Sequence, residues 1–279
     1  MTHTPIRLVA LDLDGTTLND QKQITPRTRA ALLAALEQGV AVVPATGRTA
    51  TGISPELLAL PGVRYAITSN GARVQDLTTG QTLAAVNIPT ELALQAHDLL
   101  RQYDCTVDLF QNGQGYCTRH SLDNYARLAP ANLLPYLRSS RQPVPDLRAV
   151  IAAQPDGVEK LTTLFAREDQ LQAAWAQMEA LGLAAVSSLP GNIELNAAGV
   201  DKGAGLLLLA RHLSIDPAQT MACGDGGNDI PMLQAAGIGV AMANAFEEVK
   251  AAADYLTASN EEDGVAKAIE RFVLGRPGL

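Results

Sequence analysis

Alternation of predicted strands and helices at both ends of the chain is the feature that most constrains its fold. Near the N-terminus, Ile6–Asp12 and Val40–Ala45 are almost continuously apolar, which predicts strands that are covered on both faces of a parallel sheet. Between them, Thr25-Pro26 favours a helix start and Gly39 favours its end. The same alternation returns from Lys202 onward. The two segments together predict one α/β domain with a doubly wound parallel sheet.

The middle of the chain has a different pattern, which predicts an inserted α+β domain. Ala72–Asp76 and Gln81–Val86 resemble the two strands of a hairpin, and the helices and short strands beyond them do not alternate regularly. Residues 121–157 contain five prolines and are expected to be irregular. We therefore expect a first core segment at residues 1–86, a cap domain at 87–189 and a second core segment at 190–279.

Composition narrows the class of partner. The chain of 279 residues has 29 acidic and 21 basic side chains, a net charge of −8, which argues against a nucleic-acid partner. Its longest apolar block, Gly205–Ala210, is far shorter than the ~20 residues that span a membrane. Three cysteines without metal-site spacing and a start without signal-peptide character predict a cytoplasmic protein. The sequence carries no indication of an oligomeric state.

Polar clusters follow three of the predicted core strands and open one core helix. In open α/β sheets, ligands bind outside the carboxyl ends of the strands, so clusters in these positions are expected to meet at one edge. The four clusters are Asp12–Thr16, Thr46–Arg48, Asp201–Gly203 and Gly224–Asp229.

The chemistry of these clusters is coherent. Their acids include Asp12, Asp14, Asp225 and Asp229, and several carboxylates in one place require a cation. An all-oxygen site without His or Cys suits Mg²⁺, which takes one or two carboxylates together with a substrate phosphate. Lys202, threonine hydroxyls and backbone N–H groups suit phosphoryl oxygens. With a carboxylate as nucleophile, the predicted reaction is phosphoryl transfer through an aspartyl-phosphate.

These motifs resemble those of a known superfamily. DLDGTTL is similar to the D-x-D-G-T signature of the haloacid dehalogenase-like (HAD) phosphatases, and VVPATGR, DKGAG and GDGGNDIPML follow in the order of the remaining motifs. The pairing of TSNGA with GDGGNDIPML resembles the Cof-like subfamily, which carries a large α/β cap. The resemblance extends from Asp12 to Asp229, and therefore over most of the chain.

The resemblance implies a role for each charged residue. It makes Asp12 the nucleophile and a Mg²⁺ ligand. Asp14 would act as the general acid and base, with its backbone carbonyl facing the metal. Lys202 would neutralise Asp12 and the transferring group. Asp225 would bind Mg²⁺, and Asp229 would hold the metal site.

The resemblance also implies substrate-binding residues. Thr46 would bond the phosphoryl group, Gly47 would contribute backbone, and Asn228 would contact the phosphate or Lys202. Arg48 has two interpretations, a contact on the phosphate side or a surface ion pair. Asn70-Gly71 is either a structural turn or the lip of a substrate pocket.

The predicted function is that of a Mg²⁺-dependent phosphatase for small phosphate monoesters, such as sugar phosphates or phosphorylated cofactors. The second acid of the first motif, Asp14, supports an ester substrate, because dehalogenase relatives need no acid to protonate a halide and lack it. Two alternatives remain at this point, a phosphomutase with the same chemistry and a non-catalytic phospholigand-binding protein.

Overall fold

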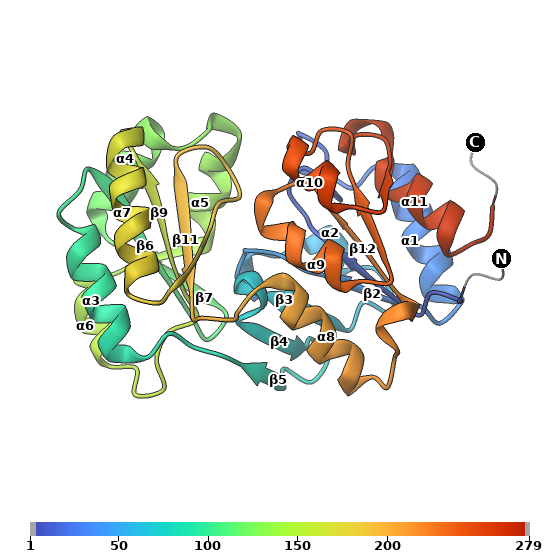
Figure 1. The fold of residues 1–279 in the computed structure, drawn as a ribbon, viewed down its shortest axis with the longest axis horizontal. Helices are drawn as coiled ribbons and strands as arrows, with labels where there is room; N and C mark the ends of the chain where they lie inside the picture. The colour runs from blue at the N-terminus through green and yellow to red at the C-terminus, as the bar shows by residue number, and fades with distance from the viewer. Residues whose placement is uncertain (1–3, 277–279) are drawn as a thin grey trace. The chain divides into compact units, whose positions relative to one another are not determined.

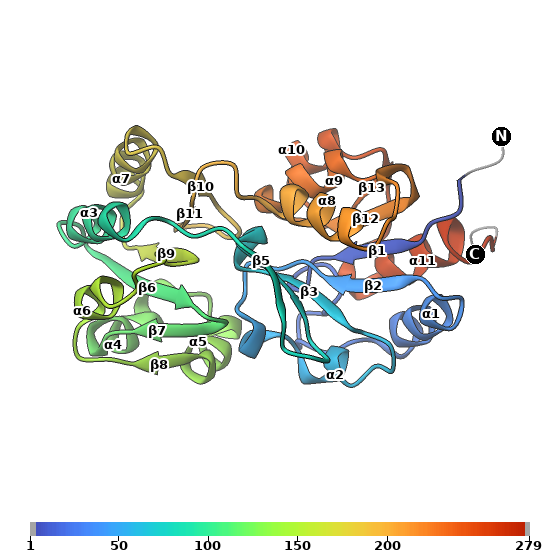
Figure 2. The same cartoon turned by 90° about the horizontal axis from the view of Figure 1, so that it is seen from below.

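The computed structural model describes residues 4–276, which divide into two compact units (Figures 1 and 2). The first unit contains the chain up to Thr46, then Ile53–Ala84, and the chain from Asp201 onward. The second unit contains Gly47–Gly52 and Ala85–Val200. The first unit is therefore built from three separate segments of the sequence.

A five-stranded parallel sheet forms the centre of the first unit, with the strand order β14-β13-β12-β1-β2. β3 continues it through a parallel bridge from Ala45 to Ile67 and begins a smaller sheet, β3-β4-β5. The mixed α/β fold predicted from the alternation is confirmed. The strands are β1 (Leu8–Leu11), β2 (Ala41–Pro44), β3 (Tyr65–Thr68), β4 (Arg73–Asp76), β5 (Thr82–Ala85), β12 (Thr220–Gly224), β13 (Ile238–Ala241) and β14 (Tyr255–Leu256).

The position of β1 determines where a ligand site can form. All four of its residues are fully buried, and at its carboxyl end Leu11 pairs with Cys223 on one side and Pro44 on the other. The chain leaves β1 toward β2 in one direction and leaves β12 toward β13 in the other. Between β1 and β12 the strand order therefore reverses, and the crevice beyond such a reversal is where α/β sheets bind ligands.

Helices cover both faces of this sheet. Figure 1 shows α9 on one side of the strands and α1 and α11 on the other. The Thr25 side chain accepts a hydrogen bond from the Thr28 N–H and caps α1, as its sequence predicts, and the Asp201 side chain caps α8 in the same way. The helices of the first unit are α1 (Pro26–Glu37), α2 (Pro55–Leu58), α8 (Lys202–His212), α9 (Ile230–Ala235), α10 (Glu247–Ala252) and α11 (Gly264–Phe272).

The second unit contains a six-stranded sheet in the order β10-β11-β9-β6-β7-β8, antiparallel except for the β7–β8 pair. Helix α3 packs beside both α6 and α7, and α4 contacts β6 and β9. Its strands are β6 (Cys105–Gln111), β7 (Gln114–Cys117), β8 (Arg141–Pro143), β9 (Lys160–Phe165), β10 (Ala184–Val186) and β11 (Asn192–Asn196). Its helices are α3 (Thr90–Leu100), α4 (Arg119–Leu128), α5 (Leu134–Ser140), α6 (Leu147–Ala152) and α7 (Glu168–Ala180).

The expectation of irregular structure at residues 121–157 is wrong. This stretch forms most of α4 and all of α5, β8 and α6. Its prolines begin, end or separate these elements instead of interrupting them: Pro130 lies between α4 and α5, Pro135 occupies the first turn of α5, and Pro143 ends β8. Proline is compatible with a first helical turn because the N–H groups there have no partner within the helix.

The limits of the second unit differ from residues 87 and 189. β11 pairs with β9, with Glu194 opposite Thr162, so the chain up to Val200 belongs to the second unit. The segment Gly47–Gly52 belongs to it as well, because the Thr51 N–H and hydroxyl both donate to the Gly113 carbonyl. A sequence pattern indicates a strand but not its partner, so the pattern alone could not assign β11 to the second unit. No helix within residues 4–276 is long and apolar enough to cross a membrane.

Two neighbouring leucines of α8 provide a test of the core. Leu209 is fully buried in the core of the first unit, whereas Leu207 is 40% exposed. We expect Leu209→Ala to lower the free energy of unfolding by about 2–5 kcal/mol, because it leaves a cavity. Leu207→Ala removes the same atoms from the surface and should cost less than about 1 kcal/mol. Urea unfolding followed by circular dichroism measures both; equal losses would contradict this packing of α8.

Candidate active site

A buried lysine between two carboxylates forms the centre of the site. Asp12 directly follows β1, and its N–H donates to the Cys223 carbonyl at 3.0 Å, which continues the β1–β12 pairing. Lys202 lies in the first turn of α8 and is fully buried. Its Nζ donates to Asp12 Oδ1 and to Asp229 Oδ1, each at 2.6 Å. These bonds join β1, α8 and the loop after β12 at one point.

The loop after β12, which carries Asp229, brings a third acid to this point, Asp225. Asp229 Oδ2 accepts hydrogen bonds from the N–H groups of Asp225 and Gly226, both at 2.9 Å, which fixes the loop. Thr16 donates from its hydroxyl to Asp225 Oδ1 at 2.6 Å, so the loop after β1 is tied to the loop after β12. Carboxylate oxygens of Asp12, Asp225 and Asp229 lie within 4.8 Å of one another.

The electrostatics of this cluster are unfavourable for three ionised acids. Burial raises the pKa of Asp12 well above its usual value, and the charges of Asp229 and Asp225 add to the effect against the opposing charge of Lys202. Burial and the charge of Asp229 raise the pKa of Asp225 to about 7. Burial would lower the pKa of Lys202, but the charges of Asp12 and Asp229 outweigh it and raise this pKa above its usual value. The lysine is therefore a permanent cation.

Two glycines allow the close packing around the cluster. Gly15 has φ +78°, and a Cβ atom there would lie 2.3 Å from Asp225 Oδ2. Gly71 has φ +95°, and a Cβ there would lie 2.0 Å from the carbonyl oxygen of Asp201, just before α8. Only glycine fits either position, because L-residues disfavour such φ values and no space exists for a side chain. These contacts support the structural-turn interpretation of Asn70-Gly71.

The Asn70 side chain connects this turn to the acidic loop. Asn228 Nδ2 donates to Asn70 Oδ1 at 3.1 Å, and both residues are buried. Asn228 thus adjoins the cluster through its neighbour Asp229. The side-chain amide of Asn228 is therefore hydrogen-bonded to Asn70, a partner that the sequence did not indicate.

Asp14 is not one of the three clustered acids, although its charge helps to raise the pKa of Asp225, and it pairs with a residue that sequence reasoning missed. Lys22 Nζ donates to Asp14 Oδ1 at 2.8 Å, and the two side chains are 26% and 34% exposed. Lys22 is in the turn after the first motif, where its N–H donates to the Asn19 carbonyl. In the sequence, a turn lysine that pairs with a site residue cannot be distinguished from a turn lysine that is exposed to solvent.

The second motif is divided between the units. Thr46 is buried in the first unit, where its N–H donates to the Ile67 carbonyl at 2.9 Å. Gly47 belongs to the second unit, and its carbonyl accepts a hydrogen bond from the buried Lys160 at 2.6 Å. Lys160 is also bonded to Glu194 at 2.8 Å. Neither Lys160 nor Glu194 was expected near this motif.

Arg48 is also part of the second unit. Its guanidinium lies over the ring of Tyr136, 4.2 Å from the centroid, and Nη1 donates to the Gly52 carbonyl at 2.8 Å. The Arg48 side chain is buried, which argues against the surface position that one of its two interpretations requires. The predicted contact with a phosphate stays a prediction.

Known proteins share this combination of motifs and fold. A sequence model of the haloacid dehalogenase-like hydrolase family matches residues 9–269. The chain is 32% identical to the putative phosphatase YxeH of Bacillus subtilis (strain 168), over 97% of this chain and 99% of the relative. It is also 32% identical to the 5-amino-6-(5-phospho-D-ribitylamino)uracil phosphatase YcsE of the same organism, over 96% of both chains.

Solved structures extend the likeness to three dimensions. A haloacid dehalogenase-like hydrolase from B. subtilis superimposes with a TM-score of 0.84 at 31% identity, over 95% of this chain and 99% of that one. The match covers both units, and the family model spans all four polar clusters. The chain therefore belongs to the haloacid dehalogenase-like hydrolase family, in which it is a Cof-like phosphoric monoester hydrolase.

Proposed function

We propose that this hydrolase is Mg²⁺-dependent and cleaves small phosphate monoesters through an aspartyl-phosphate on Asp12. The observation that carries the proposal is the charge of the buried cluster. Three carboxylates, Asp12, Asp225 and Asp229, share one ammonium group, Lys202, which leaves an excess of two negative charges when all are ionised. Burial is the main cause of the raised pKa values of Asp12 and Asp225, and repulsion from the neighbouring carboxylates adds to it.

The donor set fits Mg²⁺. It consists of carboxylate oxygens without sulfur or imidazole, and a divalent cation would offset the two excess charges. Asp12, Asp225 and the backbone carbonyl of Asp14 would hold the ion. Both Asp229 oxygens already accept protein hydrogen bonds, so Asp229 would hold Lys202 and the loop that carries Asp225. Bound there, the ion would neutralise charge on the phosphoryl oxygens.

The residues of the chain then account for each bond change. Lys202 binds Asp12 Oδ1, which leaves Oδ2 to attack phosphorus. The new Asp12–phosphorus bond replaces the ester bond, and the leaving alcohol takes a proton from Asp14. In the second step Asp14 takes a proton from water, whose oxygen displaces Asp12 from phosphorus and releases phosphate. Asp14 must leave Lys22 to do this, and the partial exposure of both side chains permits it.

The other predicted residues complete the proposal. Thr46 and Gly47 would contact the phosphoryl oxygens, and Arg48 and Asn228 would bind the substrate. The second unit would act as a cap that excludes water during transfer. YcsE acts on a phosphorylated ribitylaminouracil, which supports a small metabolite ester as the substrate class. The substrate would be identified by a phosphate-release screen of sugar phosphates, nucleotides, flavin mononucleotide and pyridoxal phosphate, with and without Mg²⁺. Analysis of the products would then distinguish a hydrolase from a phosphomutase.

The nucleophile is tested by Asp12→Asn. We expect this variant to lose Mg²⁺-dependent phosphate release from an aryl phosphate by at least about 10⁴-fold, because an amide cannot attack phosphorus. Asp156→Asn makes the same change at an exposed position of the second unit and should keep the native rate. Activity of Asp12→Asn near the native level would rule out the aspartyl-phosphate.

The role of Asp14 is tested by Asp14→Asn with 4-nitrophenyl phosphate. The nitrophenolate leaves without a proton, so formation of the phosphoenzyme should persist while its hydrolysis loses the general base. We expect a burst of up to one equivalent of nitrophenol followed by slow turnover in a stopped-flow assay. Steady turnover at the native rate would remove Asp14 from the mechanism.

The charge excess predicts how stability depends on pH without metal. Between pH ~4 and ~7 the folded protein keeps a proton on Asp225, whose pKa is raised to about 7, while the unfolded chain has released it. The free energy of unfolding in EDTA should therefore fall as the pH rises through this window. Asp225→Asn should make the fall smaller, and Mg²⁺ should restore stability above it.

Urea midpoints at several pH values measure this effect, with Asp156→Asn as the matched control. Asp12 also has a raised pKa, so its contribution to the fall should persist in Asp225→Asn. An identical slope in the native protein and in Asp225→Asn would contradict the raised pKa of Asp225.

A further inference from the structure

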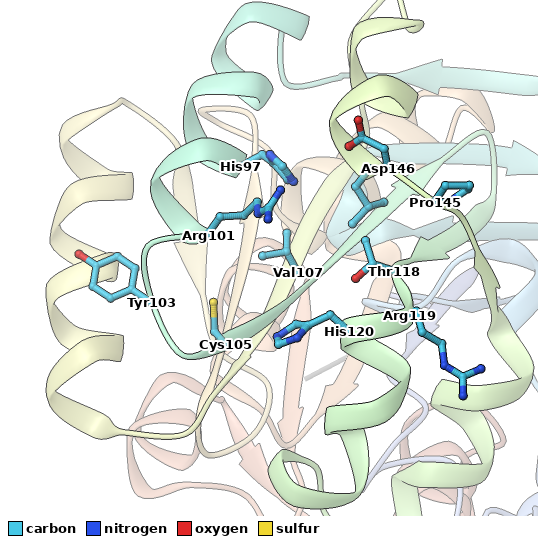
Figure 3. Close-up of a pocket in the computed structure, with 11 residues that line it drawn as sticks. His97, Arg101, Tyr103, Cys105, Val107, Thr118, Arg119, His120, Pro145 and Asp146 are labelled. Atoms are coloured by element: carbon cyan, nitrogen blue, oxygen red, sulfur yellow. The ribbon is translucent and has the colours of Figure 1, made fainter.

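A pocket of about 410 Å³ lies within the second unit, between the end of α3, strand β6, the start of α4 and the start of α6 (Figure 3). Cys105 and Val107 of β6 line it. Side chains alternate along a strand, so these two face away from Asp108, which bonds Tyr125 of α4 and Arg141. The pocket is thus separate from that buried polar network, and the proposed catalytic steps do not use it.

A buried histidine faces this pocket. His97 is 2% exposed and lines the pocket, where Figure 3 shows its ring beside the guanidinium of Arg101. Its Nδ1 pairs with Asp98 Oδ1 at 3.1 Å, and Arg148 binds the same carboxylate at 3.2 Å. His97 and Arg148 hold the pKa of Asp98 below its usual value. Ionised Asp98 accepts a hydrogen bond from Nδ1 of His97, which leaves Nε2 for a ligand. Nε2 forms no hydrogen bond with residues 4–276, and it acts as a donor when the ring is protonated.

Arg101 adds a permanent positive charge. It is exposed at the C-terminal end of α3, and its guanidinium forms no hydrogen bond or ion pair within the described part of the chain. Arg119, another lining residue, is already paired with Asp123, and Figure 3 shows its guanidinium pointing away from His120. Arg101 therefore offers a free planar fork for a carboxylate or phosphate.

The start of α4 contributes further donors. Thr118, Arg119 and His120 line the pocket. The Thr118 side chain caps the Ser121 N–H, which leaves the N–H groups of Arg119 and His120 without an intrahelical partner. The lining also includes Asp146, but its Oδ1 accepts the Arg148 N–H and caps α6. On a chain with a net charge of −8, two arginines against one aspartate make the lining locally cationic, and two histidines add ring nitrogens to it.

The rest of the lining is apolar or neutral. Val107 and Leu147 are buried, and Tyr103 and Pro145 complete this part of the lining. Burial raises the pKa of the Cys105 thiol to about 12, so this residue carries no charge and is a poor metal ligand. The volume is in the range of small-molecule sites. The lining therefore suits a molecule with an anionic head and an apolar body.

We propose that this pocket is a second ligand site, which binds a small organic anion with its phosphate or carboxylate head on Arg101 and His97 and its apolar part against Val107 and Leu147. The site is distinct from the proposed catalytic cluster and independent of the proposed function. Ligand binding at this pocket is therefore measured directly, without an assay of phosphatase activity.

Histidine side-chain NMR of the full chain, without Mg²⁺, tests the proposal. The probes are phenylphosphonate, which carries a non-hydrolysable dianion on a ring, and benzoate; inorganic phosphate tests the head alone and benzamide is the neutral control. We expect phenylphosphonate, benzoate or both to shift His97 and His120 saturably, and the comparison identifies the preferred head. His212, which packs against Tyr65 in the first unit, should not move.

Matched charge changes complete the experiment. Arg101→Gln should weaken binding about tenfold or more, because a charged hydrogen bond is lost. Arg138→Gln, an equal change at an exposed position of α5 outside the lining, should leave binding unchanged. Absence of a shift with both organic anions, equal affinity in Arg101→Gln, or equal binding of benzamide would overturn the proposal. Unchanged His212 resonances in both variants would verify that the chain remains folded.

Discussion

The buried bond set of Lys202 with Asp12 and Asp229 is the interaction on which the rest of the site depends. Removing three charged groups from water is costly, and only short hydrogen bonds with correct geometry offset that cost. These bonds require β1, α8 and the loop after β12 to meet within a fraction of an ångström. The reversal of strand order between β1 and β12 provides that meeting point, and Gly15 and Gly71 remove the side chains that would prevent it.

This arrangement places an unfavourable charge where the fold must be most rigid. Folded proteins rarely concentrate acids in the interior, and a local violation of that rule is typical of a functional site. The surrounding sheet is mostly apolar, with β1 completely buried, so its packing supports a cluster that would not be stable alone. The stability of the core and the proposed reactivity of Asp12 are consequently set by the same contacts.

Local pattern was sufficient to predict the parallel core, because buried strands and capped helices are encoded by neighbouring residues. It also located Asp12, Asp225, Asp229 and Lys202, since strand ends converge in an α/β sheet. The sequence pattern could not predict which distant segments pair with each other. The salt bridge of Lys22 with Asp14, the Lys160 contact to Gly47 and the place of β11 in the second unit depend on partners that no local signal identifies. The prolines of residues 121–157 led to a wrong prediction of irregular structure, because the effect of a proline depends on where each helix begins.

The division of the first unit into three segments also has a consequence for synthesis on the ribosome. Thr16 and Asp225, which join the loops after β1 and β12, are 209 positions apart in the chain. At roughly 5–20 residues per second, β12 follows β1 by about ten to forty seconds. By the end of this interval the second unit has all its strands, whereas β1 still lacks β12 on one side and keeps an unpaired edge that is able to associate with other chains. The nascent protein therefore passes through a stage in which the strand that leads to its proposed nucleophile has one edge open to association.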